Sequence, residues 1–249
     1  MFKKNSFSSL LPAAVFASSL FAGVSASASI ITLDFEGIAP HPSSNNILIG
    51  NYYNGGAASN GAIGPNLGII FSTGANLLCL NTLTASCSNT SKGGLGIPTS
   101  QLGAMFFPLT NPIMDIAAGF DTGFSMTFSN PHKVSIGIEV WDDLNASGNL
   151  LASAGLPSTP NGAEGTPALC EAYGSPNYCT FGNFSLGFSG VAKSVRFTGL
   201  ANVSVYDDFT FGSLTPGGGG NGQIPEPASL ALLGIGLAGL GFTRRRQRA

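Results

Sequence analysis

The sequence predicts an all-β fold, an antiparallel β-sandwich of the jelly-roll type, and three observations support this prediction. Helix signals are almost absent outside the two chain ends, and Gly, Asn, Ser and Thr recur throughout. Short apolar runs are separated by these turn-forming residues, as expected for many short strands. The segment Val134–Trp141 alternates, with Val134, Ile136, Ile138 and Val140 on one face. This pattern is typical of sheets that pack one face on a core and expose the other.

Ten segments fit this pattern. In Phe124–Phe128 the three large apolar residues are expected to face inward, and Ser125 and Thr127 outward. Two long irregular segments interrupt the strands, Gly37–Leu67 and Leu156–Tyr178. Loops of this length are usually functional or tied down, with a plain surface loop as the alternative. The predicted strands are Ile30–Phe35, Gly68–Ser72, Met105–Phe107, Met114–Phe120, Phe124–Phe128, Val134–Trp141, Leu150–Ala154, Thr180–Phe188, Val195–Thr198 and Asp208–Phe211.

The N-terminus has the three parts of a secretory signal peptide. Lys3 and Lys4 form a positive region, Leu10–Val24 is apolar, and Ala26-Ser27-Ala28 is a small-residue cleavage site. Residues 1–28 are therefore predicted to be removed on export, leaving a β-sandwich domain at residues 29–214. An uncleaved anchor is the alternative.

The C-terminus carries a second, tripartite segment at residues 224–249. Pro225, Glu226 and Pro227 precede an apolar run, 228–242, which is predicted to be a short transmembrane helix. At the α-helical rise this run spans roughly 22 Å, which is short of the hydrocarbon core and suits a temporary membrane stop. Basic residues should hold the far end on the cytoplasmic side. These basic residues are Arg244, Arg245, Arg246 and Arg248. A glycine-rich linker, residues 215–223, precedes the C-terminal segment 224–249.

This tail resembles the PEP-CTERM sorting signal of Gram-negative bacteria in its Pro-Glu-Pro, its apolar helix and its arginines. The resemblance implies recognition by exosortase, a membrane protease that removes the tail, and a cell that produces exopolysaccharide. A second resemblance, to an early segment of secreted PEP-CTERM proteins, covers residues 52–56 and 66–72, and implies a shared sandwich type. An ordinary C-terminal membrane anchor is the alternative reading of the tail.

The expected mature domain is acidic. Six of the ten basic residues lie in the two targeting ends, so residues 29–223 carry four basic and eleven acidic residues, a net charge of −7. Such a domain has no electrostatic reason to bind nucleic acid or an anionic membrane, and contact with a membrane is expected only through the C-terminal helix. Divalent cations and neutral glycans remain possible ligands.

Four cysteines form two close pairs, Cys79 with Cys87 and Cys170 with Cys179. An exported chain meets oxidising conditions, so disulfides are expected, and neither spacing is that of a zinc knuckle. Three connectivities are possible, of which two local bridges are favoured.

Enzymatic motifs are missing from the sequence, and no catalytic residue is predicted. His41 and His132 each stand beside proline, and no metalloprotease helix, nucleophile elbow or phosphate loop is present. The adjacent carboxylates Asp142/Asp143 and Asp207/Asp208 would point to opposite faces of a strand, which makes neither pair a ready acid–base dyad.

Two candidate binding sites remain. The first strand carries Asp34 and Glu36, and the last opens with Asp207 and Asp208. First and last strands often lie together in a jelly roll, so these carboxylates could hold a structural Ca²⁺, the one possible cofactor, unless they are merely solvated strand ends.

The second candidate is a glycan surface. Trp141 lies on the polar face of the best strand, followed by Asp142 and Asp143. An aromatic ring with carboxylates suits sugar binding, although a lone Trp more often covers a sheet edge or packs under a loop.

Taken together, these features predict a protein that passes transiently through the inner membrane to the cell surface or extracellular matrix. A non-enzymatic structural or adhesive role beside exopolysaccharide is favoured. A calcium-stabilised carbohydrate-binding module is the alternative, and a secreted hydrolase is the third possibility.

Overall fold

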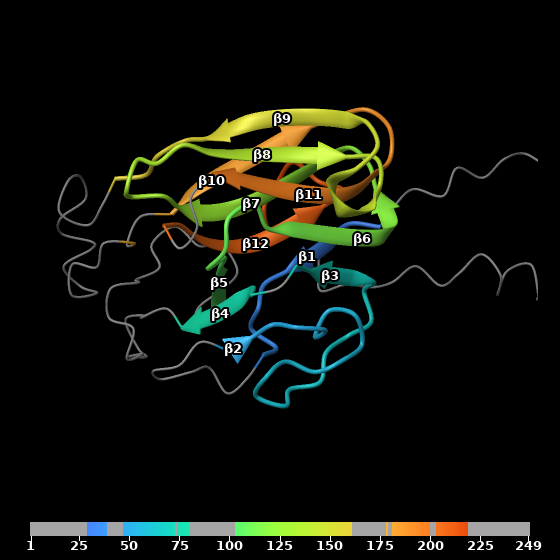
Figure 1. Ribbon diagram of the computed structural model, residues 1–249, viewed down its shortest axis with the longest axis vertical. Coiled ribbons are helices and arrows are strands. Elements are labelled where there is room, and N and C mark those ends of the chain that lie inside the picture. Colours follow the sequence, from blue (N-terminus) through green and yellow to red (C-terminus); the bar gives the residue numbers. More distant parts are fainter. Residues whose placement is uncertain are drawn as a thin grey trace, which may run out of the picture.

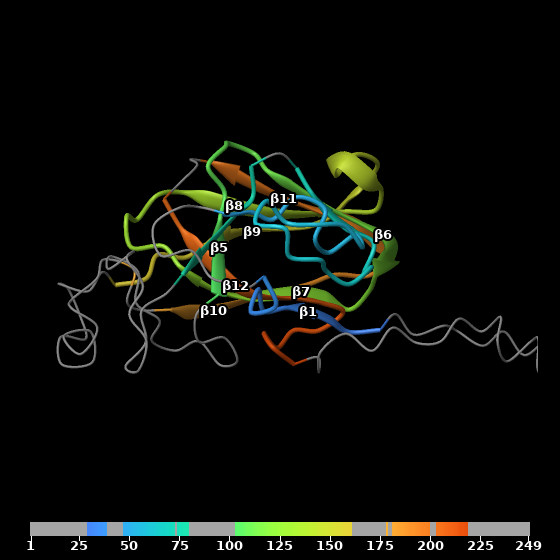
Figure 2. The same ribbon diagram turned by 90° about the horizontal axis from the view of Figure 1, so that it is seen from below.

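The computed structural model describes residues 29–38, 47–72, 74–79, 103–160, 178, 181–199 and 203–218. This part of the chain forms an antiparallel β-sandwich (Figures 1 and 2), which confirms the predicted fold class. Its elements are β1 (Ile31–Leu33), β2 (Ile47–Leu48), β3 (Ile69–Phe71), β4 (Asn76–Cys79), β5 (Gly103–Phe106), β6 (Ile113–Phe120), β7 (Gly123–Ser129), β8 (Ile136–Trp141), the 3₁₀ helix η1 (Leu144–Ala146), β9 (Leu150–Leu156), β10 (Gly182–Gly187), β11 (Ala192–Gly199) and β12 (Val205–Phe211).

Two sheets form the layers of the sandwich, and Figure 2 shows β7, β12 and β1 in one layer opposite β8, β9 and β11 in the other. The seven-stranded sheet has the order β10-β7-β12-β5-β4-β2, with β1 added on β12, and the five-stranded sheet has the order β3-β6-β11-β8-β9. All these pairings are antiparallel.

Each of the ten predicted strands has a counterpart in the structure, and β2 and β4 are additional. β2 has two residues and lies inside a segment predicted to be a loop. β4 lacks alternation because both of its sheet faces are covered: Leu77 enters the main core, and Leu78 enters a second apolar cluster on the opposite face. Neither strand therefore carries the period-2 signal on which the prediction relied.

The main core between the sheets is rich in aromatic rings. Phe197 of β11 contacts Phe124, Tyr206 and Phe209 of the facing sheet, with ring centroids 5.0 to 6.4 Å apart. Burying a side chain of this size contributes about 1.5–3 kcal/mol, so these contacts hold the two layers together.

The expectation that each sheet has one solvated face is wrong for β7. Ser125 and Thr127 point away from the main core, as predicted, yet both are fully buried. Part of the cover comes from the residues after β12: the Ser125 hydroxyl donates to the Ser213 carbonyl at 2.9 Å, and the Gly217 amide donates to Thr210 Oγ1 at 3.0 Å. The chain thus folds back over the outer face of this sheet.

β12 changes its partner strand halfway along its length. One edge of β12 pairs with β7. The other edge is shared end to end by two strands: β5 pairs with β12 at Tyr206, and β1 pairs with it at Phe209–Phe211. A bulge accompanies this change, because two residues, Asp208 and Phe209, stand opposite Met126 of β7. Asp208 has the left-handed φ of +50°, a conformation rare in residues other than glycine.

Several predicted features lie outside the described residues. They are the signal peptide, the linker beyond residue 218, the sorting segment 224–249, His41 and three of the four cysteines (Cys87, Cys170 and Cys179). Only the backbone of Cys79 is described, so both disulfides stay predictions. In the part of the chain that is described, no helix has the length and apolar character needed to cross a membrane.

Gly103 should be intolerant of any side chain, because it packs at the junction of β1 and β5. A Cβ atom there would lie 2.8 Å from the carbonyl carbon of Phe35 and 3.1 Å from the Glu36 nitrogen, both backbone atoms. We expect Gly103→Ala to lower the free energy of unfolding by about 1–3 kcal/mol, measured by chemical denaturation.

Gly155→Ala in β9 is the matched control for this substitution. No atom lies within 4 Å of the added Cβ, so this variant should be neutral or slightly stabilising. Equal stability of the two variants would contradict the tight junction.

Candidate functional site

A cleft of about 500 Å³ lies between the end of β1 and the loop that precedes β3. We call it the acidic cleft, because two carboxylates, Asp34 and Glu36, stand in its wall. Its volume falls in the range of small-molecule binding sites. The acidic cleft is lined by Thr32, Asp34, Glu36, Gly37, Tyr52, Tyr53, Pro65 and Leu67.

Glycines allow the tyrosine loop to fold onto the end of β1. A Cβ atom on Gly37 would lie 2.5 Å from the Tyr52 hydroxyl, and one on Gly64 would overlap the Tyr52 backbone. The rings of Tyr52 and Tyr53 pack edge to face, 4.9 Å apart, and both side chains are largely buried. The tyrosines therefore form a firm base for the acidic cleft.

The two carboxylates are half-buried and bind backbone amides. Asp34 Oδ1 accepts from the Glu36 amide at 3.2 Å. Glu36 Oε1 accepts from the Gly103 amide at 2.7 Å and so joins the end of β1 to the start of β5. These bonds fix both carboxylates in the wall of the cleft.

The Tyr53 hydroxyl lies under this wall. It accepts a hydrogen bond from the Phe35 amide at 3.2 Å, and Phe35 has the left-handed φ of +58°. Burial raises the pKa of Tyr53 well above its usual value, and the charge of Asp34 and, more weakly, that of Asp207 add to this rise. Burial and Asp34 also raise the pKa of Tyr52. Burial first, and then the charge of Asp34, thus keep both tyrosine hydroxyls protonated.

The four carboxylates of the calcium prediction are only partly brought together. β1 and β12 are paired, as expected. Asp34 and Glu36 line the cleft, whereas Asp207 and Asp208 are fully buried at the bulge. There the Asp208 amide donates to Asp207 Oδ1 at 2.7 Å. Their full burial excludes the alternative of solvated strand ends for these two. Within the described ranges, no three Asp, Glu, His or Cys residues form a group that could hold a metal ion.

Trp141 has protein partners on the outer face of the five-stranded sheet. Its indole N–H donates to Glu139 Oε2 at 3.2 Å, and the guanidinium carbon of Arg196 lies 5.3 Å from the ring centroid. Arg196 Nε also donates to Glu139 Oε2 at 2.7 Å. Trp141 therefore takes part in a cation–π and ion-pair cluster, as a lone Trp at a sheet surface often does.

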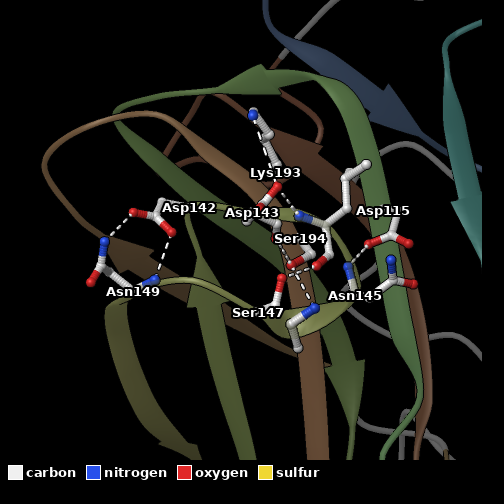
Figure 3. A network of polar contacts seen from close by, with 10 residues as sticks. Asp115, Asp142, Asp143, Asn145, Ser147, Asn149, Lys193 and Ser194 are labelled. Atoms are coloured by element: carbon white, nitrogen blue, oxygen red, sulfur yellow. Dashed lines mark hydrogen bonds and ion pairs between the residues drawn. The ribbon is translucent and has the colours of Figure 1, made fainter.

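The two aspartates after Trp141 shape the β8–β9 loop (Figure 3). Asp142 accepts from the side-chain and backbone nitrogens of Asn149, at 2.7 and 2.6 Å, and these bonds lower the pKa of Asp142. Asp143 Oδ1 accepts from the Leu144 amide at 2.8 Å and so caps η1. Both carboxylates have structural roles, and glycan binding at Trp141, Asp142 and Asp143 stays a prediction.

The loop also needs a carboxylate from β6. Asn145 and Ala146 have left-handed φ angles of +59° and +51°. Asp115 Oδ1 accepts from the Asn145 amide at 2.7 Å, and Ser194 Oγ accepts from the Ala146 amide at 3.0 Å (Figure 3). These contacts explain how residues other than glycine keep this turn.

The sequence pointed to the carboxylates of the acidic cleft but not to their neighbours. Asp34 and Glu36 are predicted calcium ligands, whereas the Tyr52–Gly56 segment is predicted to be part of a long loop and of a segment that resembles other secreted PEP-CTERM proteins, with no site residue in it. A pair of tyrosines in a glycine-rich loop was the available signal. The structure shows that this loop faces the two carboxylates.

Comparisons with known proteins identify one segment of the chain. Residues 223–246 match the family model of the PEP-CTERM protein-sorting motif, which confirms the predicted sorting signal. The matched range includes Pro225 to Pro227 and Arg244 to Arg246. No sequence among the curated proteins matches this chain.

Solved structures with distant similarity to this chain include a carbohydrate-binding module, an adhesin domain and a glycoside hydrolase. A family 6 carbohydrate-binding module is 21% identical, with 49% of this chain and 80% of that chain covered and a TM-score of 0.29. The K2 cleaved adhesin domain of Lys-gingipain is 11% identical, with 74% and 98% covered and a TM-score of 0.40. An arabinoxylan arabinofuranohydrolase of glycoside hydrolase family 43 from Bacillus subtilis is 13% identical, with 56% and 24% covered and a TM-score of 0.33. TM-scores this low carry no argument about ligand or activity.

Alkaline pH should destabilise the fold through its buried tyrosines. The pKa values of Tyr53 and Tyr206 are raised in the folded protein by burial, whereas the unfolded chain loses these protons near pH 10. Their contribution to stability is therefore complete below about pH 10 and is lost as the pH rises toward the higher folded-state values. Denaturant titrations between pH 8 and 11.5 should show this decline.

Tyr53→Phe separates this titration from other alkaline effects. The variant should be about 1–3 kcal/mol less stable at pH 8, because the buried Phe35 amide loses its acceptor, but its stability should depend less steeply on pH. Identical slopes for variant and wild type would contradict the assignment to Tyr53.

Calcium binding between β1 and β12 is tested by thermal unfolding. If the carboxylates bind Ca²⁺, calcium at 100 times its dissociation constant adds about 2.7 kcal/mol, which raises Tm by about 5–10 °C. Magnesium should do much less, since it demands a tighter octahedral shell, and Asp208→Asn should lose most of the gain. A Tm that neither chelator nor calcium changes would refute the calcium prediction.

Proposed function

We propose that this chain, which carries a C-terminal PEP-CTERM sorting motif, is a non-enzymatic structural or adhesive protein that associates with exopolysaccharide at the cell surface or in the extracellular matrix. The observation that carries the proposal is the order of the parts: a sorting motif at residues 223–246 follows an antiparallel β-sandwich. The motif indicates export and membrane-associated sorting, and it implies processing by an exosortase in the membrane.

The charge of the domain argues against a role in binding nucleic acid. Residues 29–223 have a net charge of −7, which opposes binding to anionic polymers and lipids. A neutral polysaccharide meets no such repulsion.

The adjacent carboxylates also favour binding over catalysis. Asp142 and Asp143 hold a loop, and Asp207 and Asp208 are fully buried in a bulge. A secreted hydrolase is therefore the weaker proposal, and the experiments below include a measurement of glycan cleavage.

A calcium-stabilised carbohydrate-binding module is the second candidate function, and the acidic cleft favours its carbohydrate part. Half-buried carboxylates and a threonine hydroxyl in a concave site can accept and donate hydrogen bonds to sugar hydroxyls. Whether calcium stabilises this module is tested by the thermal unfolding experiment with calcium and chelator.

Fractionation of cells tests the main proposal. The full chain, with both targeting segments, should be expressed in exosortase-containing cells that make exopolysaccharide and in matched cells that make none. We expect most of the exported protein to remain with the polysaccharide fraction in the first and to be free in the medium in the second. Equal amounts of free protein in both cultures would refute the association.

A further inference from the structure

We infer that the acidic cleft is a binding site for a neutral sugar unit, recognised through its hydroxyl groups by Asp34 and Glu36. This inference deepens the proposed association with polysaccharide by giving it a location and a ligand class. It depends on the proposed function only for the source of the sugar, because the chemistry of the cleft can be tested with defined oligosaccharides.

The polar groups of the cleft suit hydroxyl donors. Carboxylates accept hydrogen bonds from adjacent sugar hydroxyls, and such charge-assisted bonds are about twice as strong as neutral ones. Asp34, Glu36 and Thr32 are half-buried, so their bonds to a ligand would be better shielded from water than bonds at an open surface.

The apolar groups of the cleft suit the other part of a sugar. Tyr52 and Tyr53 line its base but are only 6% and 5% exposed, and the exposed Pro65 and half-buried Leu67 add further apolar residues to the lining. A sugar ring has C–H faces as well as hydroxyl edges, so a site that combines carboxylates with aromatic and aliphatic groups can contact both.

The wall and base of the cleft are held in place before any ligand binds. The Tyr53 hydroxyl accepts from the Phe35 amide, Glu36 accepts from the Gly103 amide, and the Tyr52 hydroxyl packs over Gly37. Phe35 keeps a left-handed backbone between the two carboxylates, and strain of this kind often lies at functional sites. A site ordered in advance loses little conformational entropy on binding.

Charge decides which sugars the cleft accepts. The negative charge of Asp34 already acts on the hydroxyls of both tyrosines at the base of the cleft. A uronic acid would bring a further carboxylate into this potential, where like charges repel. Neutral hexoses avoid this cost, so the cleft should select neutral glycans over uronate polymers.

Binding of defined glycans tests this inference. The exported protein, recovered after processing, should be titrated calorimetrically with neutral gluco-oligosaccharides and with uronate oligomers at low salt. We expect saturable binding of the neutral oligomers and at least tenfold weaker binding of the uronates. Equal or stronger binding of uronates would overturn the ligand class.

Substitutions then locate the site. Asp34→Asn keeps the shape of the side chain and should weaken binding by about tenfold, as expected for the loss of one charged hydrogen bond. Asp121→Asn removes the same charge from the β6–β7 turn, outside the cleft, and should bind like the wild type. Asp143→Asn tests the other sheet, and a loss there but not at Asp34 would overturn the inference.

The two proposals can fail separately. Retention on exopolysaccharide that is unchanged by Asp34→Asn would refute the cleft and leave the proposed function intact. Oligosaccharide binding that Asp34→Asn weakens, without retention on the cell's own polysaccharide, would support the cleft and refute the association. Release of reducing ends from a bound oligosaccharide would show a hydrolase and overturn the non-enzymatic role.

Discussion

The pairing of β12 is the constraint on which the rest of the structure depends. β7 occupies one edge of β12 along most of its length, and the other edge is shared by β5 and β1. Two strands that meet end to end leave a gap in the hydrogen-bond ladder, and backbone groups at that gap need other partners. The bulge at Asp208 and Phe209, the Glu36–Gly103 bond and the left-handed Phe35 all lie at this junction.

The Tyr53 hydroxyl connects this junction to the acidic cleft. It satisfies the Phe35 amide from the core side, while the charges of Asp34 and Asp207 act on it from the two strands. A buried polar group of this kind is costly unless its neighbours are fixed, so the loop that carries the tyrosines must keep one position. The acidic cleft is therefore a consequence of how the sheet is completed, and its walls come from segments far apart in the sequence.

Local pattern explains what the sequence could predict, and long-range packing explains what it could not. The alternation in β8 identified the buried Ile136, Ile138 and Val140, because period 2 follows from strand geometry alone. The burial of Ser125 could not be read in this way, since it depends on residue 213 returning over the sheet. For the site, the sequence indicated Asp34 and Glu36, which line the acidic cleft, but the loop that faces them and the bulge that buries Asp208 carry no local signal.

The pairing of β1 with β12 also places the two ends of the domain together. Ile31 pairs with Phe211, and a Cβ atom on Gly212 would lie 3.5 Å from the Ser29 carbonyl oxygen. The chain therefore enters the domain beside the point from which it leaves toward the sorting motif at residues 223–246. The Gly217 amide donates to Thr210 Oγ1, which lies 3.3 Å from the hydroxyl of Thr32 in the acidic cleft. The segment that leads toward the sorting motif therefore passes close to one side of the cleft.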